Sequence, residues 1–198
     1  CVSSASFMNK HVKEALFFSE NHTLQIQKNP LDQLIHRVID LAETKLKRHF
    51  VEVILKGVEP LDVEMDHVLI QRLLGNILSN AIDASSDGAK IMIELRRVGD
   101  PERKKEWARI RISDEGTGIS PENMTRITAG YFTTKDAGDE NRGFGLGLAI
   151  CRKIVHLHGG NLNISSEEKK GTNVQVDLPI QHEKKQPNGD SVNAEAAA

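Results

Sequence analysis

The feature that most restricts how this chain can fold is the run of residues 142–150, in which three glycines alternate and lead into an apolar segment. Gly143, Gly145 and Gly147 can follow backbone paths closed to other residues and let a ligand approach the main chain closely. The apolar segment predicts a helix, whose N-terminal N–H groups and positive dipole end form a natural seat for phosphate. The run therefore predicts a glycine-rich loop that opens a helix. Phosphate binding and a plain turn are the two interpretations of the loop.

Hydrophobic periodicity predicts that helices and strands alternate along the rest of the chain. Apolar residues at helical spacing cover 31–49 and 66–84, and a third helix runs from the glycine loop to about residue 158. Alternating apolar residues predict short strands at 24–27, 51–55, 61–65, 91–95, 108–113, 162–165 and 174–178. The last two strands predict a hairpin that closes the fold.

Capping residues mark the borders of the predicted helices. Pro30 fits the first turn of the first helix, and Asp66 is a good N-cap for the second. Gly159 and Gly160 end the third helix in the manner of a C-cap.

The connections between the predicted elements differ in length and character. Residues 57–60 predict a turn, and a charged loop at 99–106 joins two strands that we expect to be antiparallel. Residues 115–141 show no apolar period, so they form either a functional loop or a disordered segment.

The two ends of the chain differ from its centre. Residues 7–20 predict an amphipathic helix, and Phe7, Phe17 and Phe18 widen its apolar side beyond what one isolated helix can bury. The helix packs on a second helix of a bundle, on another subunit or on its own domain, and these alternatives stay open. The tail at 181–198 is polar and then alanine-rich, and we expect it to be disordered.

Composition excludes several classes of function. The net charge is −2 and aromatic residues make up 4% of the chain, which gives no reason to expect nucleic acid or an anionic membrane as a partner. Cys1 and Cys151 make no disulfide framework. No apolar run approaches the ~18 residues needed to span a bilayer, and no signal segment is present. We expect a cytoplasmic location and leave open a membrane anchor outside this chain.

Two asparagines lie in line on the second predicted helix. Asn76 and Asn80 are four residues apart, so they share one helix face, while their apolar neighbours pack inward. Amide oxygens are ligands that suit a hard divalent cation such as Mg²⁺. The alternative is an exposed polar stripe.

A carboxylate followed by two glycines stands at the end of the predicted strand 108–113. Asp114 is followed by Gly116, Gly118 and Ile119. A buried carboxylate needs hydrogen-bond donors, and the exocyclic amine of a base would supply one. The glycines would let a base lie flat against the backbone, and the alternative is a tight turn.

Three further positions have the chemistry to contact a ligand. Lys135 belongs to an island at 131–135, and Arg142 precedes the glycine run, so both can flank a phosphate or simply be solvated. Thr172 opens the last predicted strand, where its hydroxyl reaches a ligand or caps a turn.

Taken in order, five motifs resemble the N, G1, F, G2 and G3 boxes of sensor histidine kinases. They are Asn-Ile-Leu-Ser-Asn-Ala at 76–81, Asp-Glu-Gly-Thr-Gly at 114–118, Tyr-Phe-Thr-Thr-Lys at 131–135, Gly-Phe-Gly-Leu-Gly-Leu at 143–148 and Gly-Thr at 171–172. The resemblance covers roughly residues 24–179. It places the chain near the GHKL (Bergerat-fold) ATPases, which include heat-shock chaperones, type II topoisomerases and mismatch-repair ATPases. The motifs at 132–135 and 146–150 look like the kinase branch.

The resemblance implies a two-layer α/β sandwich (α+β), which agrees with the order of the predicted elements. A mixed, mainly antiparallel sheet is covered on one face by helices and preceded by an amphipathic helix. Residues 1–22 would be the end of the second dimerisation helix, 23–180 the catalytic ATP-binding domain and 181–198 the disordered tail.

For the base and the metal, the resemblance implies ATP and Mg²⁺ as cofactors. Asn76 and Asn80 would hold Mg²⁺ on the triphosphate and so act as metal-binding and catalytic residues. Asp114 would accept a hydrogen bond from the adenine amine. The residues that line the base pocket or lie near adenine would be Gly116, Gly118, Ile119 and Thr172.

For the phosphates, the resemblance implies a backbone cradle under a mobile lid at 131–142. Lys135 or Arg142 would supply counter-charges. The cradle residues would be Gly143, Gly145, Leu146, Gly147 and Leu148.

The chain departs from the family pattern at several positions. Thr128 and Gly130 stand where the loop motif has a phenylalanine and commonly a proline, and Asp83 stands where many relatives carry a basic, phosphate-contacting residue. His11 lacks the acidic residue that follows a phosphoacceptor histidine, so we expect a surface histidine there.

The function implied is that of the ATP-binding catalytic domain of a two-component sensor histidine kinase. It would transfer the γ-phosphoryl group to a histidine on a dimerisation helix outside this chain, for relay to the receiver domain of a response regulator. The full-length protein would be a homodimer. Two alternatives remain, an ATP-driven conformational clamp of the same superfamily and a non-catalytic ATP-binding docking module.

Overall fold

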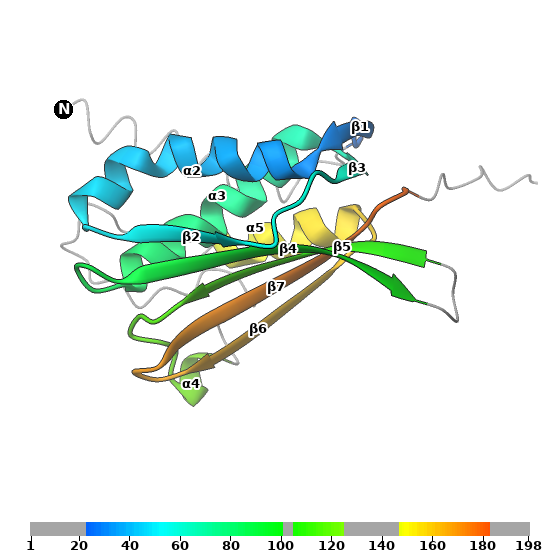
Figure 1. Ribbon diagram of the computed structural model, residues 1–198. Coiled ribbons are helices and arrows are strands. Elements are labelled where there is room, and N and C mark those ends of the chain that lie inside the picture. Colours follow the sequence, from blue (N-terminus) through cyan, green and yellow to red (C-terminus); the bar gives the residue numbers. More distant parts are fainter. Residues whose placement is uncertain (1–22, 101–104, 125–146, 183–198) are drawn as a thin grey trace, which may run out of the picture.

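Three long helices lie together on one face of a five-stranded sheet in the computed structural model, which describes residues 23–100, 105–124 and 147–182 (Figure 1). The helices are α2 (Leu31–Arg48), α3 (His67–Ala84), the short α4 (Pro121–Met124) and α5 (Gly147–Leu157). The strands are β1 (Gln27–Pro30), β2 (Glu52–Lys56), β3 (Asp62–Met65), β4 (Lys90–Asp100), β5 (Lys105–Asp114), β6 (Asn161–Glu167) and β7 (Gly171–Pro179). The predicted helix at 7–20, the lid at 131–142 and the tail beyond residue 182 lie outside the described residues.

The five-stranded sheet has the order β2-β4-β5-β7-β6. β2 pairs with β4 in parallel, and every other neighbouring pair is antiparallel, which confirms the expected mixed, mainly antiparallel sheet. At the end of β5, Asp114 is paired with Ile91 of β4 on one side and with Thr172 of β7 on the other. The end of the central strand therefore places the candidate carboxylate of Asp114 beside Thr172, which carries the candidate hydroxyl.

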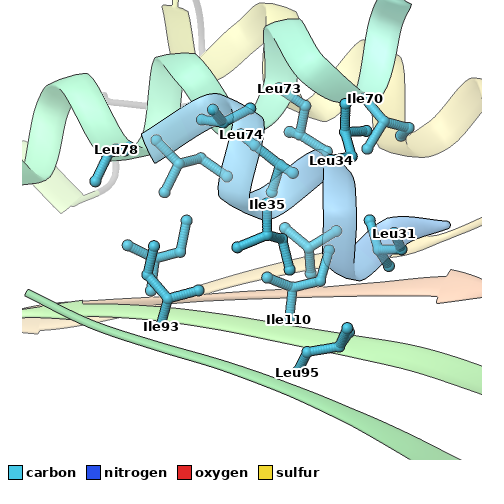
Figure 2. Packing of buried hydrophobic residues seen from close by; sticks show 14 of the residues in the cluster. Leu31, Leu34, Ile35, Ile70, Leu73, Leu74, Leu78, Ile93, Leu95 and Ile110 are labelled. Atoms are coloured by element: carbon cyan, nitrogen blue, oxygen red, sulfur yellow. The ribbon is translucent and has the colours of Figure 1, made fainter. Parts of the chain in front are cut away.

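The core lies between the helices and the covered face of the sheet. Along β5, alternate residues are buried, and along α3 the buried residues recur at helical spacing, so each element turns one apolar side inward. Figure 2 shows Ile35 of α2 with Leu74 and Leu78 of α3 packed over Ile93 and Ile110 of the sheet. None of the helices in the described ranges is long and apolar enough to cross a membrane.

Asp66 joins the start of α3 to the segment that enters the domain. Its Oδ1 accepts hydrogen bonds from the N–H groups of Val68 and Leu69 at 3.1 and 3.2 Å, which confirms it as the N-cap. Its Oδ2 accepts a hydrogen bond from the N–H of Gln25 at 3.0 Å. One carboxylate therefore fixes both a helix end and the chain that leads into β1.

His158, just after α5, links the end of that helix to Asp66 at the start of α3. Its Nε2 accepts a hydrogen bond from the N–H of Asp66 at 3.1 Å, and its Nδ1 contacts the carbonyl of Ile154 at 2.8 Å. The two bonds together require a neutral imidazole with its proton on Nδ1. Burial lowers the pKa of His158 below its usual value, and the bond to Ile154 opposes this effect in part.

The end of α5 confirms the predicted glycine C-cap. Gly159 has a φ of +68°, and its N–H donates to the carbonyl of His156 at 3.0 Å. The N–H of Gly160 donates to the carbonyl of Val155 at 2.9 Å. These two bonds form a Schellman motif, which satisfies carbonyls that the helix itself leaves open.

Some borders differ from the sequence prediction because strand pairing extends or shifts them. β1 lies on the C-terminal side of the predicted 24–27 strand and pairs with β3 in a separate two-stranded sheet. Pro30 (φ −73°, ψ 106°) is the N-cap residue of α2 and does not lie in its first turn. β4 and β5 continue through most of the predicted charged loop at 99–106, because their pairing runs as far as Asp100 and Lys105.

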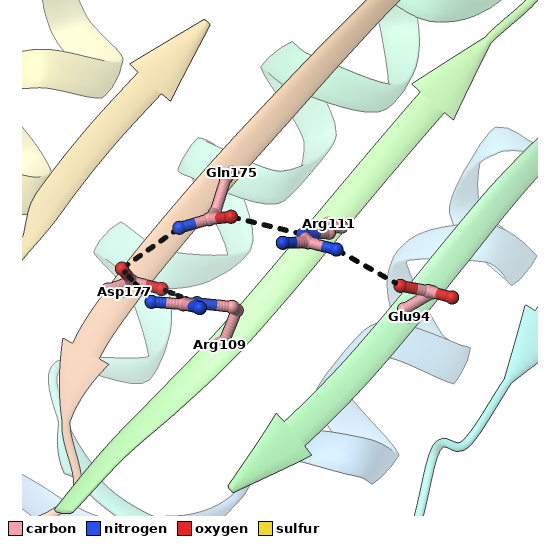
Figure 3. A network of polar contacts seen from close by, with 5 residues as sticks. All are labelled: Glu94, Arg109, Arg111, Gln175 and Asp177. Carbon is pink, nitrogen blue, oxygen red and sulfur yellow. Dashed lines mark hydrogen bonds and ion pairs between the residues drawn. The ribbon is translucent and has the colours of Figure 1, made fainter. Parts of the chain in front are cut away.

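The uncovered face of the sheet carries a network of polar side chains, which Figure 3 shows. Arg109 donates from Nε and Nη2 to the two carboxylate oxygens of Asp177 at 2.7 and 3.0 Å. Gln175 donates to Asp177 at 3.1 Å and accepts from Nε of Arg111 at 3.0 Å, and Arg111 lies 3.9 Å from Glu94. Cross-strand charge pairing thus replaces apolar packing on this face.

Candidate functional site

The candidate site centres on Asp114, a residue that is 8% exposed. Its Oδ1 accepts hydrogen bonds from the N–H groups of Gly116 at 2.9 Å and Thr172 at 3.3 Å. No donor from the described part of the chain contacts its Oδ2. Burial raises the pKa of Asp114, and the two backbone bonds offset that effect in part. A buried carboxylate with one oxygen left over is suited to a ligand that brings a hydrogen-bond donor.

The loop after Asp114 is fixed to α3 by its backbone. The N–H of Thr117 donates to the carbonyl of Ala84, the last residue of α3, at 2.9 Å. A Cβ at Gly116 would lie 2.3 Å from the same carbonyl oxygen and 2.8 Å from Oδ1 of Asp114. A side chain at position 116 would therefore collide with the protein backbone. The packing of the loop alone requires glycine there, whether or not a ligand is bound.

The same loop is fixed to the β6–β7 hairpin. Gly118 has a φ of +64°, and a Cβ there would lie 2.0 Å from the carbonyl oxygen of Glu167. The N–H of Lys169 donates to the carbonyl of Thr117 at 2.7 Å. The second glycine of the motif is thus also required by packing between backbone segments.

Ser166 of β6 is a site residue that the sequence interpretation missed. Its hydroxyl donates to the carbonyl of Gly171 at 2.8 Å, accepts from the N–H of Ile119 at 2.9 Å and lies 2.9 Å from Oγ1 of Thr172. Its inward position in an alternating strand was the one signal available, and that signal does not distinguish it from other serines. Ser166 holds Ile119 and Thr172 beside Asp114, so these three predicted residues are brought together.

Asn76 of α3 lies where α5 packs against that helix. Asn76 is half-buried and lies close to the thiol of Cys151, while Asn80, one turn further on, is exposed. The Cys151 thiol also lies 3.8 Å from the carbonyl of Leu73, and burial raises its pKa to about 12. Asn76 is thus close to the second turn of α5.

The glycine loop itself is only partly described. Gly147 and Leu148 form the first residues of α5 and are half-buried. The other predicted phosphate-contacting positions lie outside the described residues: Lys135, Arg142, Gly143, Gly145 and Leu146.

A lysine from α2, also missed by the sequence interpretation, reaches the asparagine-bearing face of α3. Nζ of Lys45 lies 2.7 Å from Oδ1 of Asp83 and donates to the carbonyl and the hydroxyl of Ser79 at 3.0 and 2.6 Å. Asp83, the residue that departs from the family pattern, is thus paired with a cation from another helix. Sequence periodicity alone could not reveal this pair, because 38 positions separate the two residues.

The model of the family described as "Histidine kinase-, DNA gyrase B-, and HSP90-like ATPase" matches residues 65–182. Sporulation kinase D of Bacillus subtilis (strain 168) is 30% identical over 175 residues, which cover 87% of this chain and 32% of that protein. The chain spans less than half the length of the curated relatives it matches.

Solved structures show the same fold. The catalytic domain of histidine kinase ThkA is 29% identical with a TM-score of 0.67, over 79% of this chain and 97% of that one. ThkA in complex with response regulator protein TrrA is 27% identical with a TM-score of 0.71, over 90% of this chain and 49% of that one. The element order and the sheet described above are therefore those of a histidine kinase catalytic domain.

Proposed function

The chain belongs to the family of histidine kinase-, DNA gyrase B- and HSP90-like ATPases, and from this membership we propose that it is the ATP-binding catalytic domain of a sensor histidine kinase. Residues 23–180 would form this domain, after the end of a dimerisation helix at 1–22 and before a disordered tail at 181–198. The observation that carries the proposal is the buried Asp114 carboxylate, whose Oδ2 lacks a donor within the described residues.

Asp114 fits the recognition of adenine. Its Oδ1 is occupied by two backbone N–H groups, so Oδ2 is the oxygen that accepts from the exocyclic amine. Gly116, Gly118, Ile119 and Thr172 would line the pocket around it. The packing of both glycines against backbone supports a preformed pocket, because it holds the loop in place without a ligand.

Asn76 and Asn80 fit a magnesium ion, since their amide oxygens are the hard ligands that this ion takes. When bound, Mg²⁺ would neutralise phosphate oxygens and favour phosphoryl transfer. Asn76 is half-buried beside Cys151, and Asn80 is exposed on the same helix. The backbone from Gly143 to Leu148 would hold the phosphates, with Lys135 or Arg142 as counter-charges.

We propose that the γ-phosphoryl group passes to a histidine on a dimerisation helix outside this chain and then to a receiver domain, within a homodimer. The complex of ThkA with response regulator protein TrrA supports a response regulator as the last of these partners. The proposed use of ATP implies a cytoplasmic location, whether or not the full-length protein is anchored in a membrane. Catalysis would depend on positioning and charge neutralisation.

Calorimetric titration with ATP and Mg²⁺ tests the binding step. We expect saturable binding by the unaltered chain and by Asp87→Ala, a matched change at an exposed carboxylate. Asp114→Asn should lose about 10- to 150-fold in affinity, because a charged acceptor for the amine is removed. Asp114→Asn should also narrow the preference for ATP over inosine triphosphate, which carries an oxygen in place of the amine. Equal ATP binding by Asp114→Asn would refute the assigned role.

A labelling assay with [γ-³²P]ATP tests the transfer step. We expect little acid-labile, base-stable phosphate on this chain alone, and labelling of a supplied dimerisation helix pair that carries a histidine followed by an acidic residue. A nucleotide-dependent dimer with hydrolysis but no transfer would favour the clamp. Mg·ATP binding with no transfer to any supplied bundle would favour the docking module.

A further inference from the structure

One ion pair links α2 to the helix that carries the proposed magnesium ligands. Lys45, near the end of α2, extends its ammonium group to Asp83 near the end of α3 at 2.7 Å. The pair is well shielded, with side-chain exposures of 25% for Lys45 and 14% for Asp83. The same ammonium donates to both oxygen atoms of Ser79, so it contacts three oxygens of a single helical turn.

The position of Asp83 gives this pair a consequence for the site. Asp83 lies three residues after Asn80 and seven after Asn76, and at helical spacing the three side chains share one face of α3. A carboxylate on that face lies beside the place proposed for a triphosphate. An unneutralised carboxylate there would repel the phosphates and weaken binding.

The contacts of Lys45 go beyond those of an ordinary surface pair. Exposed ion pairs contribute little because water screens them and because two long side chains must be ordered. Here the lysine is ordered by three oxygens, and one of them is a carbonyl of the helix backbone. The charge of Asp83 is therefore neutralised at a fixed place.

We propose that Lys45 is a positioning residue for the nucleotide: it neutralises Asp83 and holds the Ser79–Asp83 turn, so that the asparagine-bearing face of α3 accepts a triphosphate. The inference rests on the proposed function, because it names a further residue of the same site. Lys45 acts through Asp83 and Ser79 and does not itself contact the nucleotide.

The test compares ligands that differ in charge. Calorimetric titration in the presence of Mg²⁺ would measure the affinity of the 198-residue chain for ATP, ADP and adenosine. Lys45→Met should weaken ATP binding about tenfold, ADP less, and adenosine not at all, since repulsion by Asp83 scales with ligand charge. Lys45→Gln, which keeps a hydrogen-bond donor but no charge, should show the same order.

Two further variants separate electrostatics from general damage. Lys47→Met removes a cation from the same helix, where Lys47 pairs with Glu43 at 2.6 Å on the exposed side, and should leave every affinity unchanged. Asp83→Asn in the Lys45→Met background should restore ATP affinity to within about twofold, because the repelling charge is gone.

The outcomes distinguish the two proposals. An unaltered chain that does not bind ATP would overturn the proposed function. ATP binding that Lys45→Met and Lys45→Gln leave intact would overturn this inference alone. An equal loss for ATP and adenosine would also overturn it, as would a loss that Asp83→Asn fails to restore, because Lys45 would then act through folding or by direct contact.

Discussion

Replacing Gly118 with alanine should destabilise the domain even when no nucleotide is present. Gly118 has a φ of +64°, and a Cβ there would lie 2.0 Å from the carbonyl oxygen of Glu167 and 2.8 Å from its carbonyl carbon. Both atoms belong to the backbone of β6, so neither can move aside as the end of a flexible side chain could. The loop or the strand must shift.

The magnitude follows from two separate costs. A left-handed conformation costs a residue with a side chain about 1–2 kcal/mol. An overpacked contact that forces a backbone shift costs about 1–3 kcal/mol. The free energy of unfolding should therefore fall by about 2–5 kcal/mol, a large part of the total stability of a typical domain.

Two other glycines serve as matched controls. Gly88 has a φ of +80° with nothing within 4 Å of an added Cβ, so Gly88→Ala should cost about 1–2 kcal/mol from the backbone alone. Gly75 lies inside α3, also with nothing within 4 Å, so Gly75→Ala should stabilise the chain by about 0.5–1 kcal/mol. Urea unfolding followed through the fluorescence of Trp107, the single tryptophan, measures all three.

The result that would refute this reasoning is specific. If Gly118→Ala unfolds like Gly88→Ala without nucleotide and loses only nucleotide affinity, the glycine serves the approach of a base and not the packing of the loop. A loss near the upper end of the range, present without ligand, supports the packing argument.

Three further outcomes can be measured in the same unfolding experiments. The free energy of unfolding should fall as the pH drops below 6.5, by at most about 1.4 kcal/mol per pH unit, because the unfolded chain takes up a proton that buried His158 does not accept; His158→Gln should show a shallower slope. Asp66→Ala should cost about 2–3 kcal/mol, since three backbone N–H groups lose their acceptor, whereas Asp62→Ala, at an exposed pair, should cost less than about 1 kcal/mol. Arg109→Ala on the open sheet face should lower the free energy of unfolding by no more than about 1.5 kcal/mol, despite the two short bonds from Arg109 to Asp177. A loss above about 3 kcal/mol would mean that the polar network is a main source of the stability of the sheet.

Much of the fold could be predicted from local patterns. α3 was predicted with its N-cap at Asp66, because apolar spacing and capping chemistry are properties of neighbouring residues. The assignment of strands to sheets could not be predicted in the same way. The sequences of β2 and β3 alternate alike, yet β2 joins the main sheet and β3 pairs with β1, because that choice depends on partners distant in the chain.

The sequence predicted which residues belong to the candidate site, but it did not predict the contacts that they make. The sequence pointed to Asp114 and Thr172, which the strand register brings side by side although 58 positions separate them. It did not indicate that backbone N–H groups already occupy Oδ1 of Asp114, nor that Ser166 contacts Ile119 and Lys45 contacts Ser79. These contacts depend on side chains that meet only after the sheet and helices have assembled.

The two ends of the proposed site are joined through the backbone of α3. The N–H of Thr117 fixes the Asp114 loop to the carbonyl of Ala84, and Asn80 lies four residues earlier on that helix, a rise of about 6 Å. Lys45 ties the same turn to α2. The spacing between the residues proposed for base recognition and those proposed for metal binding is therefore set by helix geometry and by the close packing of Gly116 and Gly118. It follows that Ala84 and Lys45, which the proposal does not place against the nucleotide, would help to decide where its base and its phosphates can lie at once.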